Sequence, residues 1–375
     1  LKYMKIEVNN NTVIFNNNNQ KTEIHPLWLR ERVNGKEYLD QKTDQRLFDP
    51  SFLENIKIKN AIIKKKTLEL TFDDGVNSKF QIDKLMSELI DSENLLNTIK
   101  INLWDSSLKD RPQYNFDKGF CESKEMYNLL KSFYKYGFVI VKNLPVENNY
   151  IVNFANSLGN VRPTNFGEFF NVKSLPNPND LAYTSLSLSP HTDNPYRKPV
   201  PCIQLLHCIE NEVSGGFSTL VDGFKVATHL RDNNPDFFKI LTKIKVKFKF
   251  ADKDVILEND GTLIELDENK NLKQVRFSTR LDFVPILEKK KLDLYYKARK
   301  KISDLYNSKK FRIEFKLMPG DLVMIDNHRL LHGRTVYDAN EGSRFLQGCY
   351  VDYDSTEGKL RYLKKKFKLE NLTNQ

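Results

Sequence analysis

The sequence predicts a mainly β protein with a few inserted helices, of the β-sandwich or jelly-roll type. From residue 201 onward, short apolar runs of strand length follow one another, with polar turn clusters between them. Helical periodicity interrupts these runs only near 223–242 and 287–306. Because strands and helices do not alternate regularly, a parallel sheet built of βαβ units is disfavoured.

The first hundred residues are expected to form a separate, small β domain. The chain has 375 residues, more than one typical core needs, so we expect two domains with bounds 1–104 and 105–375. In the first, β-type runs such as Thr12–Phe15 and Leu68–Phe72 alternate with turn clusters. A polar bridge, 105–118, separates the first domain from the rest of the chain.

The second domain is predicted to open on a helix and a buried strand. Met126, Leu129 and Phe133 recur at helical spacing after the candidate cap Ser123. The apolar run Phe138–Val141 then fits a buried strand, and the next stretch, 147–158, has a helical pattern. The strands expected after residue 200 are 202–206, 218–221, 244–250, 263–266, 311–317 and 322–325.

The formal charge of +10 allows a nucleic-acid or anionic-surface partner. Scattered lysines and the lack of a recognised nucleic-acid motif favour a bias in composition instead, although the excess charge weakly favours an anionic substrate. The four cysteines form no CxxC pair and predict no disulfide framework. No segment approaches the roughly 20 apolar residues of a membrane helix. We therefore expect a cytoplasmic protein that binds neither membranes nor nucleic acid.

The motif His191-Thr192-Asp193 carries the sharpest chemical signal. Residues i and i+2 of a strand point to one face, so the imidazole and the carboxylate can meet on one metal ion. The best third ligand is His332. Two histidines and one carboxylate leave coordination positions open, which is the ligand set of non-haem Fe(II) oxygenases. The plainer alternative is a surface histidine beside a turn aspartate.

A matched arginine makes the metal interpretation more specific. Arg344 lies twelve residues after His332, at the start of another apolar run. Its guanidinium can form a bidentate pair with the distal carboxylate of 2-oxoglutarate. The pattern therefore favours an enzyme that uses Fe(II), 2-oxoglutarate and O2.

Several segments resemble the γ-butyrobetaine/trimethyllysine dioxygenase family, within the taurine-dioxygenase-like superfamily. The resemblance implies a double-stranded β-helix (jelly-roll) core, a small N-terminal domain and a homodimer. It spans about 25–365. The matching segments are Ala182-Tyr183-Thr184, His191-Thr192-Asp193, Gln204-Leu205-Leu206-His207-Cys208, Gly215-Gly216, Val221-Asp222-Gly223, Asp326-Asn327 and Arg329-Leu330-Leu331-His332-Gly333-Arg334.

The resemblance also implies roles for single residues. Ser218 and Leu206 would line the 2-oxoglutarate site, whereas His207 and His328 fall at packed rather than ligand positions. Ring faces attract a trimethylammonium group, which cannot donate hydrogen bonds. The family's cage of such rings falls here on Phe166, Phe170, Tyr183 and Tyr350. Ordinary core aromatics are the alternative.

The sequence departs from the family in the N-terminal domain. Several members hold a structural zinc with cysteines just after a Trp-Leu-Arg motif. Here Trp28-Leu29-Arg30 is present, but 31–50 contains neither cysteine nor histidine. A zinc site of that kind cannot form, so we expect polar contacts to hold this loop.

The anionic end of the substrate is the least determined part of the prediction. Where the family's γ-butyrobetaine enzymes place amides, this chain has Asp180 and Ser278, with Arg280 two residues on. An aspartate would repel a carboxylate, whereas a phosphonate can bring a proton to it. The best guess is therefore hydroxylation of 2-(trimethylamino)ethylphosphonate, which some members perform. Two alternatives stay open: hydroxylation of γ-butyrobetaine to carnitine, and a non-catalytic protein that binds quaternary ammonium compounds.

Overall fold

In the computed structural model, the chain divides into two compact units, Leu1–Asn97 and Thr98–Gln375. The structure describes residues 4–17, 20–90, 96, 99–173 and 185–369. Among the helices of these residues, none combines the length and the apolar composition needed to cross a bilayer.

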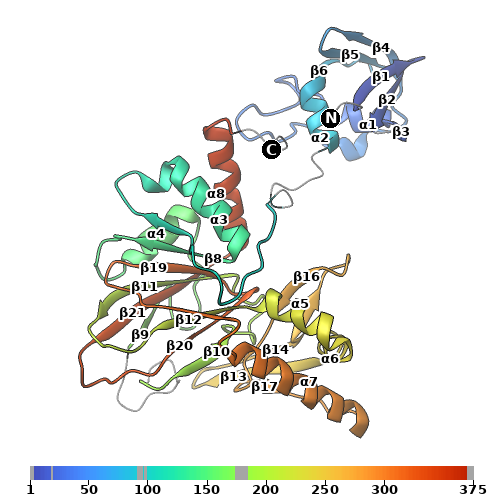
Figure 1. The fold of residues 1–375 in the computed structure, drawn as a ribbon. Coiled ribbons are helices and arrows are strands. Elements are labelled where there is room, and N and C mark those ends of the chain that lie inside the picture. Colours follow the sequence, from blue (N-terminus) through green and yellow to red (C-terminus); the bar gives the residue numbers. More distant parts are fainter. Residues whose placement is uncertain (1–3, 18–19, 91–95, 97–98, 174–184, 370–375) are drawn as a thin grey trace. The chain divides into compact units, whose positions relative to one another are not determined.

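In its described residues, the first unit contains two antiparallel sheets, two short α-helices and the 3-10 helix Pro50–Phe52 (Figure 1). In β5 every second residue is buried, and Leu68, Leu70 and Phe72 join one apolar core. This alternation is what the pleat of a half-buried strand requires. The elements are β1 (Lys5–Asn9), β2 (Thr12–Asn17), β3 (Gln20–Glu23), α1 (Pro26–Arg30), β4 (Ile58–Lys64), β5 (Thr67–Phe72), β6 (Asn77–Gln81) and α2 (Ile82–Ile90).

Arg30 organises the loop that follows α1. Its Nε donates to Asp74 Oδ2 at 2.7 Å. Its guanidinium lies 5.1 Å from the ring centroid of Tyr38 and 5.3 Å from that of Phe48. One buried cation thus ties three parts of the unit together by an ion pair and by cation–π contacts. The loop that lacks zinc ligands is held by these contacts.

Two sheets form the centre of the second unit. We call them the large sheet, ordered β7-β8-β19-β11-β21-β9, and the small sheet, ordered β10-β20-β12-β18. Apart from the parallel β7–β8 pair, the strand pairs in both sheets are antiparallel. Phe138 and Val323 of the large sheet share one core with Leu220 and Ile313 of the small sheet, so the two sheets face each other. The strands are β7 (Gln113–Asn115), β8 (Phe138–Lys142), β9 (Phe170–Val172), β10 (Leu188–His191), β11 (Ile203–Asn211), β12 (Ser218–Asp222), β18 (Arg312–Phe315), β19 (Leu322–Asp326), β20 (Leu330–Arg334) and β21 (Arg344–Val351).

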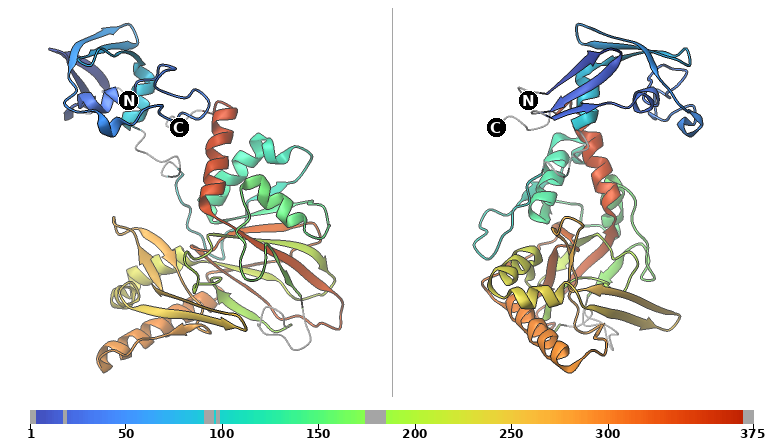
Figure 2. Two further views of the ribbon diagram at one scale, coloured as in Figure 1. Left: turned by 180° about the vertical axis from the view of Figure 1, so that it is seen from behind. Right: turned by 90° about the vertical axis from the view of Figure 1, so that its right-hand side faces the viewer.

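Helices α3 (Lys124–Tyr136), α4 (Tyr150–Leu158) and α8 (Tyr353–Lys366) gather on one side of the large sheet (Figures 1 and 2). The hydroxyl of Ser123 accepts from two backbone N–H groups of the first turn of α3. Gly137 ends α3 at φ +80°, a conformation that glycine adopts without strain. The strand β8 follows directly, as the sequence predicts.

The helical stretch predicted as one element over 223–242 is two helices. Pro235 lacks a backbone N–H and disfavours helical geometry at the preceding residue, and Asn234 has φ −142°. The chain therefore ends one helix and begins another at this point. On the outer side of the small sheet, helices and strands pack around a second core. These elements are α5 (Gly223–Asn233), α6 (Pro235–Leu241), β13 (Lys245–Asp252), β14 (Val255–Thr262), β15 (Ile264–Leu266), β16 (Leu272–Val275), β17 (Asp282–Phe283) and α7 (Lys289–Asn307).

A buried ion pair connects the small sheet to its surroundings. Arg329 and Asp222 are 2% and 0% exposed, and the guanidinium donates to both carboxylate oxygens, at 2.7 and 3.2 Å. Asp222 also caps α5 through the N–H of Phe224 and accepts from the N–H of Trp104. The guanidinium further donates to the carbonyl of Asn102.

We expect Arg329→Met to lower the free energy of unfolding by about 3–5 kcal/mol, because Asp222 would remain buried without its counter-charge. Urea unfolding of wild type and variant measures this difference. The matched control is Arg231→Met, which removes a half-exposed arginine on α5 paired with Asp232 at 3.4 Å. The control should change stability by less than about 0.5 kcal/mol. Equal unfolding midpoints for the two variants would contradict the prediction.

Candidate active site

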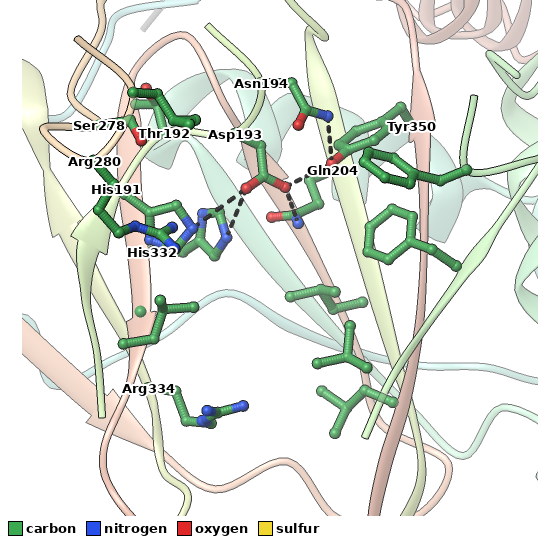
Figure 3. A pocket seen from close by; sticks show the side chains of 18 of the residues that line it. His191, Thr192, Asp193, Asn194, Gln204, Ser278, Arg280, His332, Arg334 and Tyr350 are labelled. Atoms are coloured by element: carbon green, nitrogen blue, oxygen red, sulfur yellow. Dashed lines mark hydrogen bonds and ion pairs between the residues drawn. The ribbon is translucent and has the colours of Figure 1, made fainter. Parts of the chain in front are cut away.

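The predicted triad His191, Asp193 and His332 comes together in one pocket (Figure 3). His191 ends β10 and His332 lies opposite it on β20, with ring centroids 4.4 Å apart. The Nε2 atoms of His191 and His332 lie 3.4 and 3.5 Å from Asp193 Oδ1. One ligand atom from each residue lies within 4.8 Å of the others. Two imidazoles and one carboxylate at this spacing fit an Fe(II) ion bound on one face.

Asp193 does not lie on a strand, contrary to the prediction from the motif's spacing. The strand β10 ends at His191, and Asp193 lies in the loop that follows. The buried side chain of Asn327 replaces the missing strand neighbour. Its Oδ1 accepts from the N–H of Asp193 at 2.7 Å, and its Nδ2 donates to the carbonyl of Asp193 at 3.0 Å. The backbone N–H and carbonyl of Asp193 are thus both satisfied by one amide side chain, as they would be by a neighbouring strand.

The protonation states suit metal binding. His191 Nδ1 lies 2.9 Å from the carbonyl of Ser189, which favours a proton on Nδ1 and leaves Nε2 facing Asp193. Burial lowers the pKa of His332 to about 4, so the ring is neutral at pH 7. Burial alone would raise the pKa of Asp193, but the hydrogen bond donated by the hydroxyl of Tyr350 favours the charged form, and the pKa lies below its ordinary value. Asp193 is therefore a carboxylate.

The second oxygen of Asp193 is occupied by two donors. Gln204 Nε2 lies 2.5 Å from Oδ2, and the hydroxyl of Tyr350 donates to the same atom at 2.7 Å. Burial and the neighbouring Asp193 raise the pKa of Tyr350 well above its ordinary value, so its hydroxyl stays protonated. Oδ1 is left for the metal. The predictions gave Gln204 no role, although a lone polar residue in the apolar run Cys202–Leu206 was a usable signal.

Two buried arginines line the pocket together with the triad. Arg344 begins β21 and Arg334 ends β20. Burial, reinforced by the charge of Arg334, lowers the pKa of Arg344 to about 10, so its guanidinium remains charged at neutral pH. Arg344 Nε donates to the carbonyl of Gly216, where a Cβ would lie 2.7 Å from that nitrogen. Figure 3 shows Arg334 separated from the metal ligands by apolar side chains. Ser218 and Leu206, predicted on the family resemblance, line the same pocket.

Aromatic rings form another wall of the pocket. Phe170 and Tyr350 lie 5.4 Å apart, between centroids, and Phe166 lies 5.7 Å from Phe250. Tyr196 stacks on Phe250 at 4.9 Å. The predictions missed both Tyr196 and Phe250, because neither lies within a motif that the family resemblance maps onto the cage.

The remaining predicted residues divide into two groups. Ser278 is buried and Arg280 is exposed, and both line the pocket. Asp180 and Tyr183 lie outside the residues that the structure describes. The absence of a side chain at Gly348 leaves room for Phe170, because a Cβ on residue 348 would lie 2.4 Å from the Phe170 ring.

The two histidines predicted not to be ligands lie away from the triad. His207 is fully buried, and burial lowers its pKa to about 4. His328 lies 3.1 Å, through Nε2, from the carbonyl of Val200, and its ring packs at 5.2 Å against Tyr353. Neither residue lines the pocket described above.

Comparison with known proteins agrees with this geometry. Residues 110–350 match the model of the Taurine catabolism dioxygenase TauD, TfdA family. Gamma-butyrobetaine dioxygenase of Homo sapiens is 31% identical over 360 residues, covering 92% of this chain and 93% of that protein. Mitochondrial trimethyllysine dioxygenase of Rattus norvegicus is 28% identical, covering 90% of this chain and 82% of that protein.

A solved structure of an asparagine oxygenase, in complex with Fe(II), a hydroxyasparagine and succinate, is also similar. It covers 64% of this chain and 93% of its own, with a TM-score of 0.48 and 13% identity. The family match and the sequence relatives confirm the prediction of a dioxygenase that resembles the γ-butyrobetaine and trimethyllysine enzymes. The chain belongs to the TauD, TfdA family of dioxygenases.

Proposed function

We propose that the protein is an Fe(II)- and 2-oxoglutarate-dependent hydroxylase of a small trimethylammonium zwitterion. The observation that carries the proposal is the shared pocket, which His191, Asp193 and His332 line together with two buried arginines and a wall of rings. A protein that only binds such cations would not need a three-ligand metal site. We also propose that the two facing sheets are the jelly-roll core of the family.

The triad would hold the metal, and the arginines the cosubstrate. Fe(II), when bound, supplies the activation of O2, with 2-oxoglutarate as the co-reductant that is converted to succinate and CO2. Arg344 would bind the distal carboxylate of 2-oxoglutarate, assisted by Ser218, and Arg334 adds a second positive charge nearby. Leu206 would pack against the methylene groups of the cosubstrate. The oxygen of Asp193 that faces His191 and His332 stays available to the metal, because Gln204 and Tyr350 engage the other.

The rings would orient the substrate. A trimethylammonium group has no N–H to donate, so ring faces are the groups that can stabilise it in a dry pocket. Phe166, Phe170, Tyr196, Phe250 and Tyr350 supply such faces in the described part of the pocket. The names of the relatives, γ-butyrobetaine and trimethyllysine dioxygenase, point to the same class of substrate.

We expect Phe170→Leu to weaken trimethylammonium substrates by about 0.5–2 kcal/mol, because leucine keeps the apolar volume and loses the ring face. Calorimetric titration under anaerobic conditions measures the change in affinity. A neutral analogue that carries a tert-butyl group is the matched control ligand and should lose much less. Equal losses of affinity for both ligands would mean that the aromatic wall acts only as an apolar surface.

For the anionic end of the substrate, we propose a phosphonate ahead of a carboxylate, that is, 2-(trimethylamino)ethylphosphonate ahead of γ-butyrobetaine. The proposal is based on Asp180, Ser278 and Arg280 in the sequence. We expect Asp180→Asn to raise kcat/KM for γ-butyrobetaine and to lower it for the phosphonate, because a phosphonate can bring a proton to an aspartate at its anionic end, whereas a carboxylate cannot. Steady-state kinetics with both substrates measures the ratio. An unchanged ratio, or a wild type that already prefers γ-butyrobetaine, would leave the carboxylate as the substrate's anionic group.

The decisive test of the function is a succinate-release screen with Fe(II), 2-oxoglutarate and a panel of quaternary ammonium carboxylates and phosphonates. We expect stimulation by at least one member of the panel, with a hydroxylated product in equal amount. Succinate release that no quaternary ammonium compound stimulates would contradict the proposed substrate class.

A further inference from the structure

A chain of hydrogen bonds connects the aromatic wall to the metal-ligand carboxylate. Asn194 directly follows Asp193 and has φ +49°, a conformation that asparagine tolerates better than most residues. Its amide lies between two tyrosines: Tyr196 Oη is 2.6 Å from Asn194 Oδ1, and Asn194 Nδ2 is 2.9 Å from Tyr350 Oη. Tyr350 Oη in turn lies 2.7 Å from Asp193 Oδ2. Figure 3 shows Asn194 beside Tyr350, with Asp193 between them and the histidines.

The direction of this chain follows from the chemistry of its members. A carboxylate only accepts hydrogen bonds, so the hydroxyl of Tyr350 must donate to Asp193. The oxygen of Tyr350 therefore accepts from the NH2 group of Asn194, which leaves the amide carbonyl to accept from the hydroxyl of Tyr196. All donors point toward Asp193. Hydrogen bonds aligned in this way polarise and strengthen one another.

Both tyrosines also present their rings to the pocket. Tyr196 stacks on Phe250 with an interplanar angle of 18°, and Tyr350 packs against Phe170. Each tyrosine therefore contributes a ring to the wall of the pocket and a hydroxyl to the chain that ends on Asp193. Asn194 is the one amide that joins the two hydroxyls in this chain.

We propose that Asn194 is a positioning residue that couples occupancy of the aromatic subsite to the geometry of the metal ligand Asp193. The inference rests on the proposed function, because it needs a cation against the rings and a metal on the triad. A cation that settles between the rings fixes Tyr196 and Tyr350, and through Asn194 their hydroxyls hold Asp193 Oδ2. Oδ1 is then aimed at the metal. Coupling of two binding sites is reciprocal, so a bound metal strengthens cation binding by the same factor.

The experiment measures this coupling directly. Ni(II) replaces Fe(II), so that no turnover occurs, and its Kd is determined by calorimetry with 2-oxoglutarate present. The titration is repeated with saturating γ-butyrobetaine, or with 2-(trimethylamino)ethylphosphonate where wild type binds that probe more tightly. The coupling factor is the ratio of the two Kd values. For wild type we expect a factor of about 10, within the usual range for coupled sites.

Two variants test the chain and a third serves as the control. Asn194→Ala removes the amide, and Tyr196→Phe keeps the stacked ring while removing one hydroxyl; both should lower the coupling factor clearly below the wild-type value, while the direct bond from Tyr350 to Asp193 remains. Tyr353→Phe is the matched control, because it removes a comparable tyrosine–carboxylate bond, 2.6 Å to Asp326 Oδ1, outside the pocket. It should keep the wild-type factor. Should Asn194→Ala fail to fold, Tyr196→Phe decides alone.

The outcomes separate this inference from the proposed function. A wild type that binds Ni(II) but neither probe would remove the proposed substrate class, and this inference with it. The wild type could also bind a probe and show the same coupling factor as Asn194→Ala and Tyr196→Phe. That result would contradict the inference and leave the proposed function unaffected. In turnover with Fe(II), we expect the two variants, unlike Tyr353→Phe, to release succinate in excess of hydroxylated product.

Discussion

Replacing His332 by alanine is expected to lower turnover by roughly 1,000-fold or more, which corresponds to about 4 kcal/mol of lost transition-state stabilisation. The described residues hold one His-Asp-His group, and its three ligand atoms leave no spare donor for the metal. An alanine removes one of the two imidazoles that Fe(II) would bind. Succinate formation in the presence of substrate measures the effect.

The same variant should lose metal affinity while it remains folded. Calorimetric titration with Ni(II) gives the affinity, and thermal unfolding without metal shows whether the variant keeps its core. His229→Ala is the matched control, because His229 lies on α5, away from the pocket, and contacts Asn233. The control should turn over like wild type. Fe(II)-dependent turnover near the wild-type rate in His332→Ala would remove this histidine from the metal site.

The fold was predictable where local pattern decides the structure. The apolar run Phe138–Val141 is the buried strand β8, and the periodic residues after Ser123 form α3. The single helix predicted over 223–242 was wrong because periodicity continues across Pro235, whereas the backbone cannot. Pro235 marked the boundary between the two helices in the sequence. It is a stronger signal than the helical spacing of apolar residues on either side of it.

The metal ligands could be found from spacing, whereas the convergence of Gln204 and Tyr350 on one oxygen of Asp193 could not. Residue type and distance along the chain identify the three ligands His191, Asp193 and His332. Gln204 and Tyr350 reach the same oxygen of Asp193 because they are register partners on β11 and β21. Pairing between strands 146 positions apart in the sequence cannot be read from either strand alone.

The aromatic wall illustrates the same limit. Phe250 lies on β13, among elements that pack outside the small sheet, and it lines the pocket beside Tyr196, which stacks on it. In the sequence it is one aromatic residue in a strand of ordinary alternation. Its role depends on a tertiary contact with a loop that follows the metal motif, so no local pattern marks it.

Replacing Arg344 by methionine is expected to raise the apparent KM for 2-oxoglutarate by about 10- to 100-fold. Hydrogen bonds to a charged group contribute roughly 1.5–3 kcal/mol, and a buried carboxylate would lose a bidentate partner. Methionine keeps much of the side chain's length and apolar packing against Gly216. Initial rates of succinate formation over a range of 2-oxoglutarate concentrations measure the effect, with substrate saturating. Arg231→Met, on the outer helix α5, is the control and should leave this KM unchanged.

The companion variant Arg344→Lys separates charge from geometry. A lysine keeps the positive charge but presents a point charge in place of the planar fork, so it should restore only part of the affinity. The nearby Arg334 offers a second guanidinium on the same pocket, and its charge helps to lower the pKa of Arg344. If Arg344→Met leaves the KM unchanged while Arg334→Met raises it, Arg334 is the cosubstrate's partner. A large increase in both variants would mean that the carboxylate needs the field of two buried cations, because neither alone offsets its desolvation.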